Sequence, residues 1–289
     1  MLRTDNASAP SPRSRWLVST DWLAEHSKDR DVAVVDGSYL VLQKRDAHAE
    51  YRNGHIPGAV FFDIDAISDH STELPHMLPG PRHFSEAIGA LGIGDDTTVV
   101  IYDSVGLYSA PRVWWTFRVF GAKNVYILEG GLPKWKSEGR PLETGDGKRP
   151  PQKFNAEMNV EAVAMLADMR MALTDQNTQI VDARSAERFC GKAPEPRPGL
   201  RSGHMPGAFN VPFDRVLDNG TLASRNRIEA AFKDAGVDLD KPIITSCGSG
   251  LTAAILTFAL DSIGTTAKRL YDGSWTEWGS RPDLPVEHD

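Results

Sequence analysis

The sequence predicts an α/β protein made of two homologous domains, each with a mainly parallel sheet flanked by helices. A hexapeptide is duplicated, as Gly-His-Ile-Pro-Gly-Ala at 54–59 and Gly-His-Met-Pro-Gly-Ala at 203–208. In both halves, short apolar runs alternate with segments of helical periodicity. The spacing also repeats, because Asp103 lies 32 residues before Trp135 and Cys247 lies 31 residues before Trp278. Duplication of one α/β unit accounts for all three observations.

Each half contains an apolar run that is expected to be a strand and that ends in aspartate, at Val32–Asp36 and Gln179–Asp182. The hexapeptide follows this strand in both halves. Its Pro-Gly pair suits a type II turn, because Pro fixes φ at the second position and Gly accepts a positive φ at the third. We therefore expect the hexapeptide histidines, His55 and His204, to be structural rather than catalytic.

A second apolar strand in each half leads into a loop of small residues. We expect these strands at Thr98–Tyr102 and 242–246, followed by loops that begin at Asp103 and Cys247. A helix is expected after the second loop, at 251–260. Other segments with helical periodicity are 83–91 and 228–235. Each half then closes on a short run that contains Gly and Trp, at 129–135 and 272–278.

These patterns divide the chain into four parts. Residues 1–15 are expected to be a flexible tail, 16–141 a first domain, 142–155 a linker and 156–289 a second domain. The linker is predicted because 137–155 is rich in Pro, Gly, Lys and Glu and lacks apolar periodicity, which is typical of an exposed connection.

Composition argues against several functional classes. The 289 residues carry a formal net charge of -7, which disfavours binding to nucleic acid or to an anionic membrane surface. No apolar stretch approaches the ~20 residues that span a bilayer, and the first residues lack a hydrophobic signal core. Two cysteines cannot form a disulfide framework. We expect a cytoplasmic protein, although the Arg- and Ser-containing N-terminus leaves organellar import open.

The loop at Cys247 is the main candidate for chemistry. A buried strand, the tight Cys-Gly-Ser-Gly loop and an apolar helix follow one another here. Glycines let successive N–H groups turn inward and the helix points its positive end at the same place, so an anion at Cys247 is stabilised. We expect a thiolate nucleophile. Cys190 lacks this setting and is expected to be incidental.

Other reactions of a Cys or His fit this sequence less well. Acyl transfer needs a His base close in space, which the sequence cannot place. A Cys-x5-Arg phosphatase loop needs Arg six residues after the Cys, where this chain has Ala253. A metal site at Asp69, His70 and His76 is disfavoured because no thiolate ligand accompanies these residues.

The duplicated hexapeptides, the loop Cys-Gly-Ser-Gly-Leu-Thr at 247–252 and a Cys at this place in the second half only resemble the two-domain rhodanese family. The similarity extends from about residue 16 to residue 285. Within the family, the match is to the 3-mercaptopyruvate sulfurtransferase branch. Thiosulfate-specific members carry basic residues directly after the Cys, whereas this chain has Gly248 and Ser249. Leu251 replaces the more usual Val, which is a conservative change.

The resemblance implies two rhodanese-like domains, of which only the second is catalytic. The implied reaction moves sulfur from 3-mercaptopyruvate through a Cys247 persulfide to a thiol such as thioredoxin or glutathione, or to cyanide, and releases pyruvate. Asp103 stands in the first half where the second has Cys247 and cannot carry this sulfur. No metal or organic cofactor is implied.

The resemblance also assigns substrate-binding residues. Five basic residues and three acidic ones lie between Asp182 and Arg201, and planar Arg side chains suit a small keto acid. The family patterns Arg-Phe-x-Gly and Pro-Glu-Pro-Arg are matched at Arg188 and Arg197. The remaining implied contacts to sulfur and substrate come from the loop, at Gly248, Gly250, Leu251 and Thr252.

A proton relay of Ser249, His76 and Asp65 is implied as well, and it would place the active site between the two halves. Without the resemblance, Ser249 could equally cap the following helix.

Two alternatives stay open. The first is thiosulfate:cyanide sulfurtransferase, with the same nucleophile and a different donor. The second belongs to another class, a redox sensor or binding module in which Cys247 is oxidised or docks a protein without turnover. A carboxylate grip by Arg188 and Arg197 favours an enzyme, because a sensor does not need one.

Overall fold

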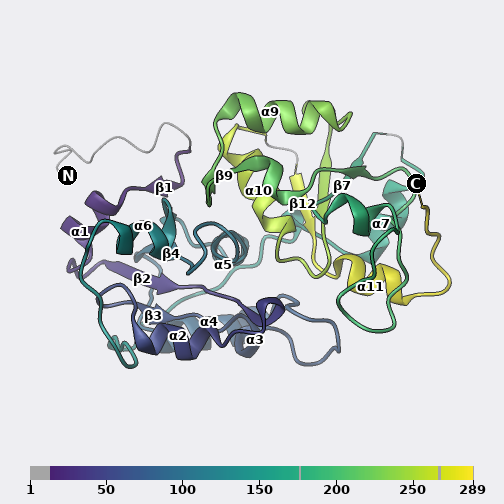
Figure 1. Ribbon diagram of the computed structural model, residues 1–289. Coiled ribbons are helices and arrows are strands. Elements are labelled where there is room, and N and C mark those ends of the chain that lie inside the picture. The colour runs from purple at the N-terminus through teal and green to yellow at the C-terminus, as the bar shows by residue number, and fades with distance from the viewer. Residues whose placement is uncertain (1–13, 176, 266–267, 289) are drawn as a thin grey trace.

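Each half of the chain carries a five-stranded parallel sheet in the computed structural model, which describes residues 14–175, 177–265 and 268–288. The strand orders are β1-β5-β4-β2-β3 and β6-β12-β11-β7-β8. These orders are identical once each strand is matched with its counterpart, so the two halves share one topology. Figure 1 shows the two lobes side by side, with the first half in purple to teal and the second in green to yellow.

The strands are short, and most are buried, as expected for a parallel sheet with helices on both faces. Those of the first sheet are β1 (Leu17–Val18), β2 (Val32–Asp36), β3 (Val60–Phe61), β4 (Thr98–Tyr102) and β5 (Val125–Leu128). Those of the second sheet are β6 (Val163–Ala164), β7 (Gln179–Asp182), β8 (Phe209–Asn210), β11 (Ile243–Ser246) and β12 (Lys268–Tyr271). A separate antiparallel hairpin is formed by β9 (Leu217–Asp218) and β10 (Thr221–Leu222).

Helices connect these strands. In the first half they are α1 (Thr20–His26), η1 (Val41–Gln43), α2 (Ala47–Asn53), α3 (Ile64–Ile67), α4 (Pro81–Ala90), α5 (Ala110–Val119) and α6 (Gly131–Ser137). In the second half they are η2 (Val160–Ala162), α7 (Leu166–Ala172), α8 (Ala186–Phe189), η3 (Phe213–Val216), α9 (Arg225–Asp234), α10 (Ala253–Ser262) and α11 (Ser274–Ser280).

The α/β fold and its duplication are confirmed, and the differences from the expected elements are small. The strands expected at Val32–Asp36, Thr98–Tyr102 and Gln179–Asp182 have those bounds, while β11 begins one residue later than expected. Helix α10 begins at Ala253 rather than at 251. Its start is delayed because the loop runs through residue 252 and turns at Gly250, whose φ is +78°.

Both hexapeptide histidines are structural, as expected. Gly58 and Gly207 have φ values of 75° and 68°, which the turn requires. His55 and His204 are buried, and the Nδ1 atom of each lies 2.9 Å from a backbone carbonyl oxygen. The same polar contact has therefore been kept in both copies.

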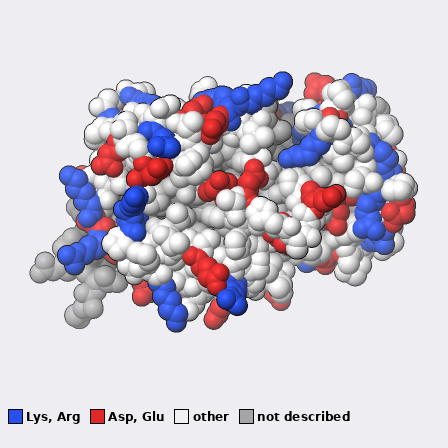
Figure 2. Space-filling model, turned by 90° about the horizontal axis from the view of Figure 1, so that it is seen from below, with Lys and Arg blue, Asp and Glu red and all other residues white. Residues whose placement is uncertain are grey.

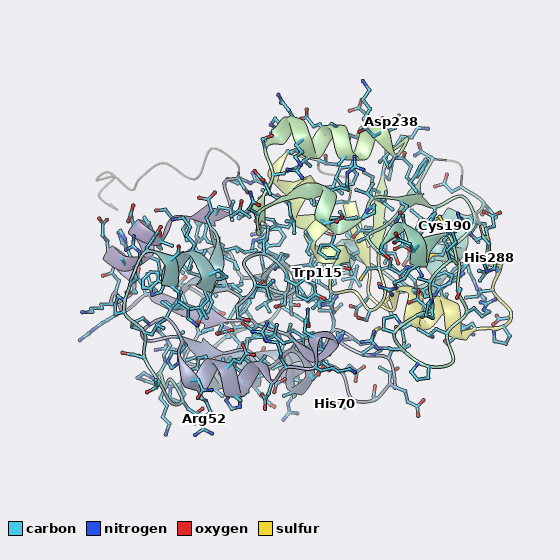
Figure 3. The ribbon with its side chains drawn as sticks, in the orientation of Figure 1. Arg52, His70, Trp115, Cys190, Asp238 and His288 are labelled. Carbon is cyan, nitrogen blue, oxygen red and sulfur yellow. The ribbon has the colours of Figure 1, made fainter. Side chains whose placement is uncertain are left out.

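Helices α5 and α10, which follow the two equivalent loops, meet at the interface between the halves. The rings of Trp114 and Phe258 pack edge to face with centroids 5.0 Å apart. Trp115, labelled in Figure 3, lies at this junction. The apolar core is continuous from one sheet to the other through these helices. The interface is therefore core-like, and it fixes the position of the first half relative to the Cys247 loop.

The connection between α6 and η2 contains no helix or strand among the described residues apart from an isolated bridge at Glu143. It is not exposed throughout, because Phe154 is buried and packs against Phe84 and Phe117 of the first half. The tail expected at 1–15 falls almost entirely outside the described residues.

The surface is mixed in charge. On the face seen in Figure 2, Lys and Arg side chains alternate with Asp and Glu, and no continuous basic stripe crosses that face. Within the described part of the chain, no helix has both the length and the apolar character needed to cross a membrane.

Candidate active site

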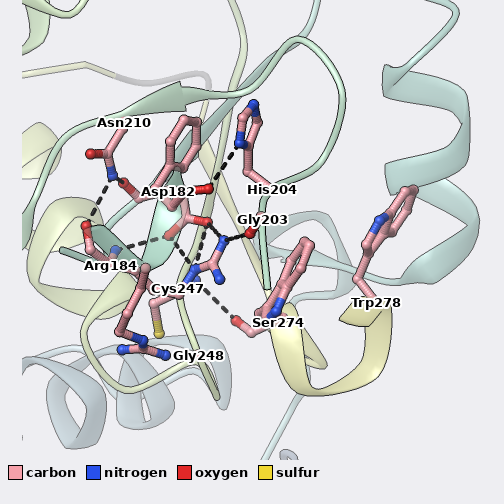
Figure 4. A network of polar contacts seen from close by, with 12 residues as sticks. Asp182, Arg184, Gly203, His204, Asn210, Cys247, Gly248, Ser274 and Trp278 are labelled. Atoms are coloured by element: carbon pink, nitrogen blue, oxygen red, sulfur yellow. Dashed lines mark hydrogen bonds and ion pairs between the residues drawn. The ribbon is translucent and has the colours of Figure 1, made fainter. Parts of the chain in front are cut away.

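Cys247 lies at the carboxyl end of β11, a strand paired on both sides with β7 and β12. The side chain is buried, with 1% of the residue exposed. Its backbone is held by the start of α11, since its N–H lies 3.3 Å from Ser274 Oγ and its carbonyl oxygen accepts the Trp275 N–H at 2.9 Å. Figure 4 shows the Cys247 sulfur beside this polar network.

The loop that follows exposes a run of hydrogen-bond donors. The backbone N–H groups of residues 249–253 donate no hydrogen bond to any residue that the structure describes. Buried N–H groups without an acceptor are costly and rare. This run of donors therefore indicates that the loop binds an anion, and Cys247 supplies the sulfur next to it.

The equivalent loop of the first half shows what such donors can hold. Asp103 occupies the place of Cys247, because its carbonyl oxygen accepts the Leu132 N–H as that of Cys247 accepts Trp275. Its carboxylate accepts five backbone N–H groups at 2.7 to 2.9 Å, those of Val105, Gly106, Tyr108, Ser109 and Ala110. In the first loop, the backbone N–H donors are thus satisfied by an anionic side chain of the protein itself.

Arg188 lies against the Cys247 loop. A Cβ atom at Gly248 would lie 3.0 Å from Arg188 Nη2, so only Gly leaves the guanidinium in its present place without a shift. Arg188 is paired with the buried Glu195, which also binds Arg184 at 2.8 Å. The Arg188 side chain is 23% exposed, so one side of it faces solvent next to the loop.

His76 and Asp65 come from the first half and lie together, with His76 Nδ1 2.9 Å from Asp65 Oδ1. On the other side of the ring, His76 Nε2 lies 3.4 Å from Arg197 Nη2 of the second half. Arg197 can only donate, so Nε2 is the acceptor and the ring proton resides on Nδ1. His76 therefore links the two halves as a neutral imidazole.

The titration of this pair agrees with that assignment. Burial lowers the pKa of His76, and Asp65 opposes this shift. Contact with His76 in turn lowers the pKa of Asp65. At neutral pH, a carboxylate therefore faces a buried neutral imidazole.

The structure brings some of the expected site residues together and not others. Gly248, Gly250, Leu251 and Thr252 form the loop itself. Ser249 is buried in the same loop, but no hydrogen bond joins it to His76 within the described residues, since Arg197 occupies the second ring nitrogen. The three-membered relay stays a prediction.

Sequence reasoning missed Arg112, a buried residue of α5. Arg112 Nη2 lies 2.7 Å from Asp272 Oδ1 of the second half, and Nη1 donates to the Gly250 carbonyl oxygen at 3.4 Å. It also donates to the carbonyl oxygen of His76. Gly is needed at 250 because φ is positive and a Cβ would lie 2.8 Å from Arg112 Nη1. Arg112 thus ties the Cys247 loop to the first half.

Two tyrosines of the first half were missed as well. Burial raises the pKa of Tyr108, and Cys247 and Arg188 are among the charges that act on it. Burial also raises the pKa of Tyr39, with Asp65 adding to the shift. Its ring packs edge to face on that of His76, with centroids 4.7 Å apart. Such neighbours lack a local sequence signal, because they reach the site only across the interface.

The residues considered for a metal do not converge. Among the described residues, no three His, Cys, Asp or Glu side chains are placed to hold a metal ion.

Cys190 lies at the outer end of the second half, near His288 in Figure 3. The chain is closely packed here, since a Cβ atom at the neighbouring Gly191 would lie 2.5 Å from the His288 ring.

Known proteins share both the sequence and this architecture. An Escherichia coli 3-mercaptopyruvate sulfurtransferase is 48% identical over 274 residues, which cover 94% of this chain and 98% of that protein. The crystal structure of the E. coli 3-mercaptopyruvate sulfotransferase SseA superposes with a TM-score of 0.84 at 45% identity, covering 90% of this chain and 98% of that one. A rat thiosulfate sulfurtransferase is 40% identical over 275 residues, 92% of this chain and 93% of that protein.

A family profile described as a rhodanese-like domain matches twice, at residues 19–138 and 165–281. Each match covers one half of the chain except for the first strand of its sheet, β1 or β6. The chain therefore belongs to the rhodanese-like family, of which it carries two domains.

Proposed function

We propose that this protein is a 3-mercaptopyruvate sulfurtransferase. The Cys247 thiolate attacks the sulfur of 3-mercaptopyruvate, a sulfur–sulfur bond forms, and the carbon–sulfur bond breaks with its electron pair on carbon. The proton of the substrate thiol ends on that carbon, which gives pyruvate. The Cys247 persulfide then passes its outer sulfur to a thiol, such as that of thioredoxin or glutathione, or to cyanide.

The observation that carries this proposal is the run of N–H donors at 249–253. A persulfide anion on Cys247 extends one atom further than a thiolate and would meet these donors. The Asp103 carboxylate, with five N–H contacts, illustrates an anion in the equivalent loop. The similarity to 3-mercaptopyruvate sulfurtransferases supports the choice of donor.

Arg188 and Arg197 are proposed to hold the carboxylate and ketone of the donor. Arg188 lies against Gly248. Arg197 lies 3.4 Å from His76, whose carbonyl oxygen shares the Arg112 guanidinium with the Gly250 carbonyl oxygen of the loop. Both belong to a segment that is only partly buried, which gives a small anion a way to reach them. Charge-assisted bonds from planar guanidinium groups suit such a ligand.

The proton transfer is proposed to use Ser249, His76 and Asp65. The enolate left after sulfur transfer needs a proton at carbon, and a loop hydroxyl next to Cys247 is suitably placed in the chain to relay one. Asp65 fixes His76 with its proton on Nδ1 and its Nε2 toward the second half. If a donor engages Arg197, then His76 Nε2 becomes available to accept a proton from Ser249.

The direct test measures pyruvate and hydrogen sulfide from 3-mercaptopyruvate with a thiol acceptor. Cys247→Ser should abolish turnover and remove the one-sulfur mass increase of donor-treated protein, because the variant cannot form the persulfide. Cys190→Ser is the matched control and should keep both. Turnover by Cys247→Ser comparable to that of the unchanged protein would refute the proposal. No turnover by the unchanged protein, with Cys247 still oxidised by peroxide, would favour a redox sensor.

A second donor, thiosulfate, is kept as the alternative because a thiosulfate sulfurtransferase is also similar. Gly248 and Ser249 offer no cation beside Cys247, which disfavours this donor. Ser249→Lys should raise the ratio of thiosulfate turnover to 3-mercaptopyruvate turnover. Position 248 is less suitable, since any Cβ there meets Arg188. An unchanged ratio would show that the loop does not set donor preference.

A further inference from the structure

A cavity of about 270 Å³ lies in the first half, at the carboxyl ends of β2 and β4. Its walls include Asp36 of β2, Ser38 just after this strand, Glu50 and Tyr51 of α2, Ser104 of the Asp103 loop and Leu132 of α6. The proposed sulfur transfer does not use any of them. Because the halves are duplicates, the second half shows what occupies the equivalent space there.

Four contacts fix the correspondence between the halves. Asp36 pairs with Tyr102 and Asp182 with Ser246, the last residues of equivalent strands. Two residues later, the N–H of Ser38 and that of Arg184 each donate to the preceding aspartate at 2.9 Å. Ser38 therefore corresponds to Arg184.

The other walls correspond in the same way. Leu132 matches Trp275, because each donates its N–H to the first residue of the preceding loop. Tyr51 matches Phe189, because each stacks on its hexapeptide histidine and offers that ring its carbonyl oxygen. Three residues of the cavity wall, Asp36, Leu132 and Tyr51, thus have counterparts in the second half.

In the second half, the Arg184 guanidinium fills this space. It binds the Asp182 carboxylate through Nε at 2.9 Å and Nη2 at 2.6 Å, and it donates to the Gly203 carbonyl oxygen at 2.9 Å. Figure 4 shows these bonds. The guanidinium carbon lies 4.3 Å from the centre of the Trp275 ring. Glu195 also accepts a hydrogen bond from Arg184 Nη1 at 2.8 Å, so two carboxylates, a carbonyl oxygen and a flat apolar wall form a guanidinium slot.

The first half keeps the aspartate of this slot and has Leu132 in place of the Trp275 ring. Arg45 also lines the cavity, but its guanidinium is bound to Glu50, and no cation pairs with Asp36 within the described residues. Asp36 is 1% exposed, and the groups that favour its ionised carboxylate are the Ser38 hydroxyl, the Ser38 N–H and the Tyr102 hydroxyl, none of which is a cation. Ser38 is too short to enter the space that Arg184 fills. Glu50 is already paired with Arg45 by two hydrogen bonds of 2.7 and 2.6 Å.

A second buried group in the wall lacks a partner. The Ser104 hydroxyl oxygen is buried and makes no hydrogen bond within the described residues. Buried polar groups are normally satisfied, so this hydroxyl indicates a polar occupant. A carboxyl group, an unpartnered hydroxyl, the Tyr51 ring and the apolar Leu132 side chain match the donors and faces of one planar cation.

We propose that this cavity binds the guanidinium group of a small molecule, in the place that the Arg184 side chain fills in the second half. The guanidinium donates to the Asp36 carboxylate and its faces lie against Leu132 and Tyr51. Lys136, at the cavity wall, is available to an anionic group at the other end of the ligand. This site is independent of the sulfur-transfer proposal, since it uses none of the same residues.

The test titrates the full chain with methylguanidinium at millimolar concentrations and follows binding by ligand-observed NMR or calorimetry. Saturable binding is expected for the unchanged protein. Urea, the neutral molecule of the same shape, should not bind. Asp36→Asn should weaken binding about ten- to hundredfold, the loss expected for one charge-assisted bond. Glu86→Gln, which removes an exposed acid of α4, is the matched control and should leave binding unchanged.

Ser38→Arg provides the complementary variant, because an arginine introduced there fills the slot from within the chain. It should abolish methylguanidinium binding while sulfur transfer continues, and that activity reports folding of both variants. Absence of saturable binding by the unchanged protein would overturn the proposal. Binding that survives both Asp36→Asn and Ser38→Arg would place the ligand elsewhere and would overturn it too.

Discussion

The Asp103 carboxylate offers a sharp test of the idea that these loops are built around an anion. Replacing Asp103 with Asn keeps the size and removes the charge. Oδ1 accepts two N–H groups and Oδ2 accepts three, all at 2.7 to 2.9 Å. An amide has only one oxygen, so in its better orientation it keeps three bonds and turns its NH2 group toward two N–H donors.

The cost follows from those two lost bonds. Hydrogen bonds to a charged group contribute about 1.5–3 kcal/mol each, so Asp103→Asn should lower the free energy of unfolding by about 3–6 kcal/mol. Asp103 is fully buried, so solvent does not reduce this effect. Below the unfolding transition, kcat should be retained, because Asp103 belongs to the half without the nucleophile.

Urea unfolding followed by tryptophan fluorescence measures the change. Asp46→Asn is the matched control, since Asp46 is an exposed N-cap that accepts the Ala49 N–H at 2.9 Å and Asn caps about as well. Its effect should be close to zero. If Asp103→Asn lowers the free energy of unfolding by less than about 1 kcal/mol, the charge on residue 103 contributes little, and the idea that this loop is built around an anion is refuted.

Three further changes test other parts of the structure. Arg112→Ala leaves Asp272 buried without its cation and should lower the free energy of unfolding in urea by about 3–5 kcal/mol. A loss below ~1 kcal/mol, as expected for an exposed ion pair, would contradict a buried pair. Burial raises the pKa of Asp36 to about 6, so its ionisation destabilises the fold increasingly as the pH rises from about 4 to about 6. The free energy of unfolding of Asp36→Asn should therefore exceed that of the unchanged protein by up to about 3 kcal/mol at about pH 7 and should equal it at about pH 3. A difference that does not depend on pH would contradict the raised pKa of Asp36. Arg188→Ala and Arg197→Ala should each raise KM for 3-mercaptopyruvate about ten- to hundredfold in steady-state kinetics, and an unchanged KM in both would move the carboxylate site elsewhere.

Much of the fold was predictable because its signals are local. The alternation of apolar strands and helices, and the Pro-Gly turns that place Gly58 and Gly207 at positive φ, depend on neighbouring residues only. The Cys247 loop was predictable for the same reason. The start of α10 was misplaced by two residues, since apolar periodicity does not define the residue at which a helix begins.

The site was less predictable where it depends on distant residues. In the sequence, Arg112 is a single cation within an apolar helix. It contacts Asp272 and Gly250 only because α5 packs against α10. Tyr108 is similar, because its relation to Cys247 arises across the interface. Neither has a spacing that would mark it in the chain.

By itself, the sequence determined that the chain is a duplicated α/β protein with a cysteine-bearing loop between a strand and a helix, because periodicity, turn chemistry and strand–loop–helix order act over a few residues. The tertiary structure decided which side chains surround that loop and that Asp36, unlike Asp182, is buried without a cation. Those outcomes depend on how helices and sheets pack over long separations, and no local pattern encodes such distances.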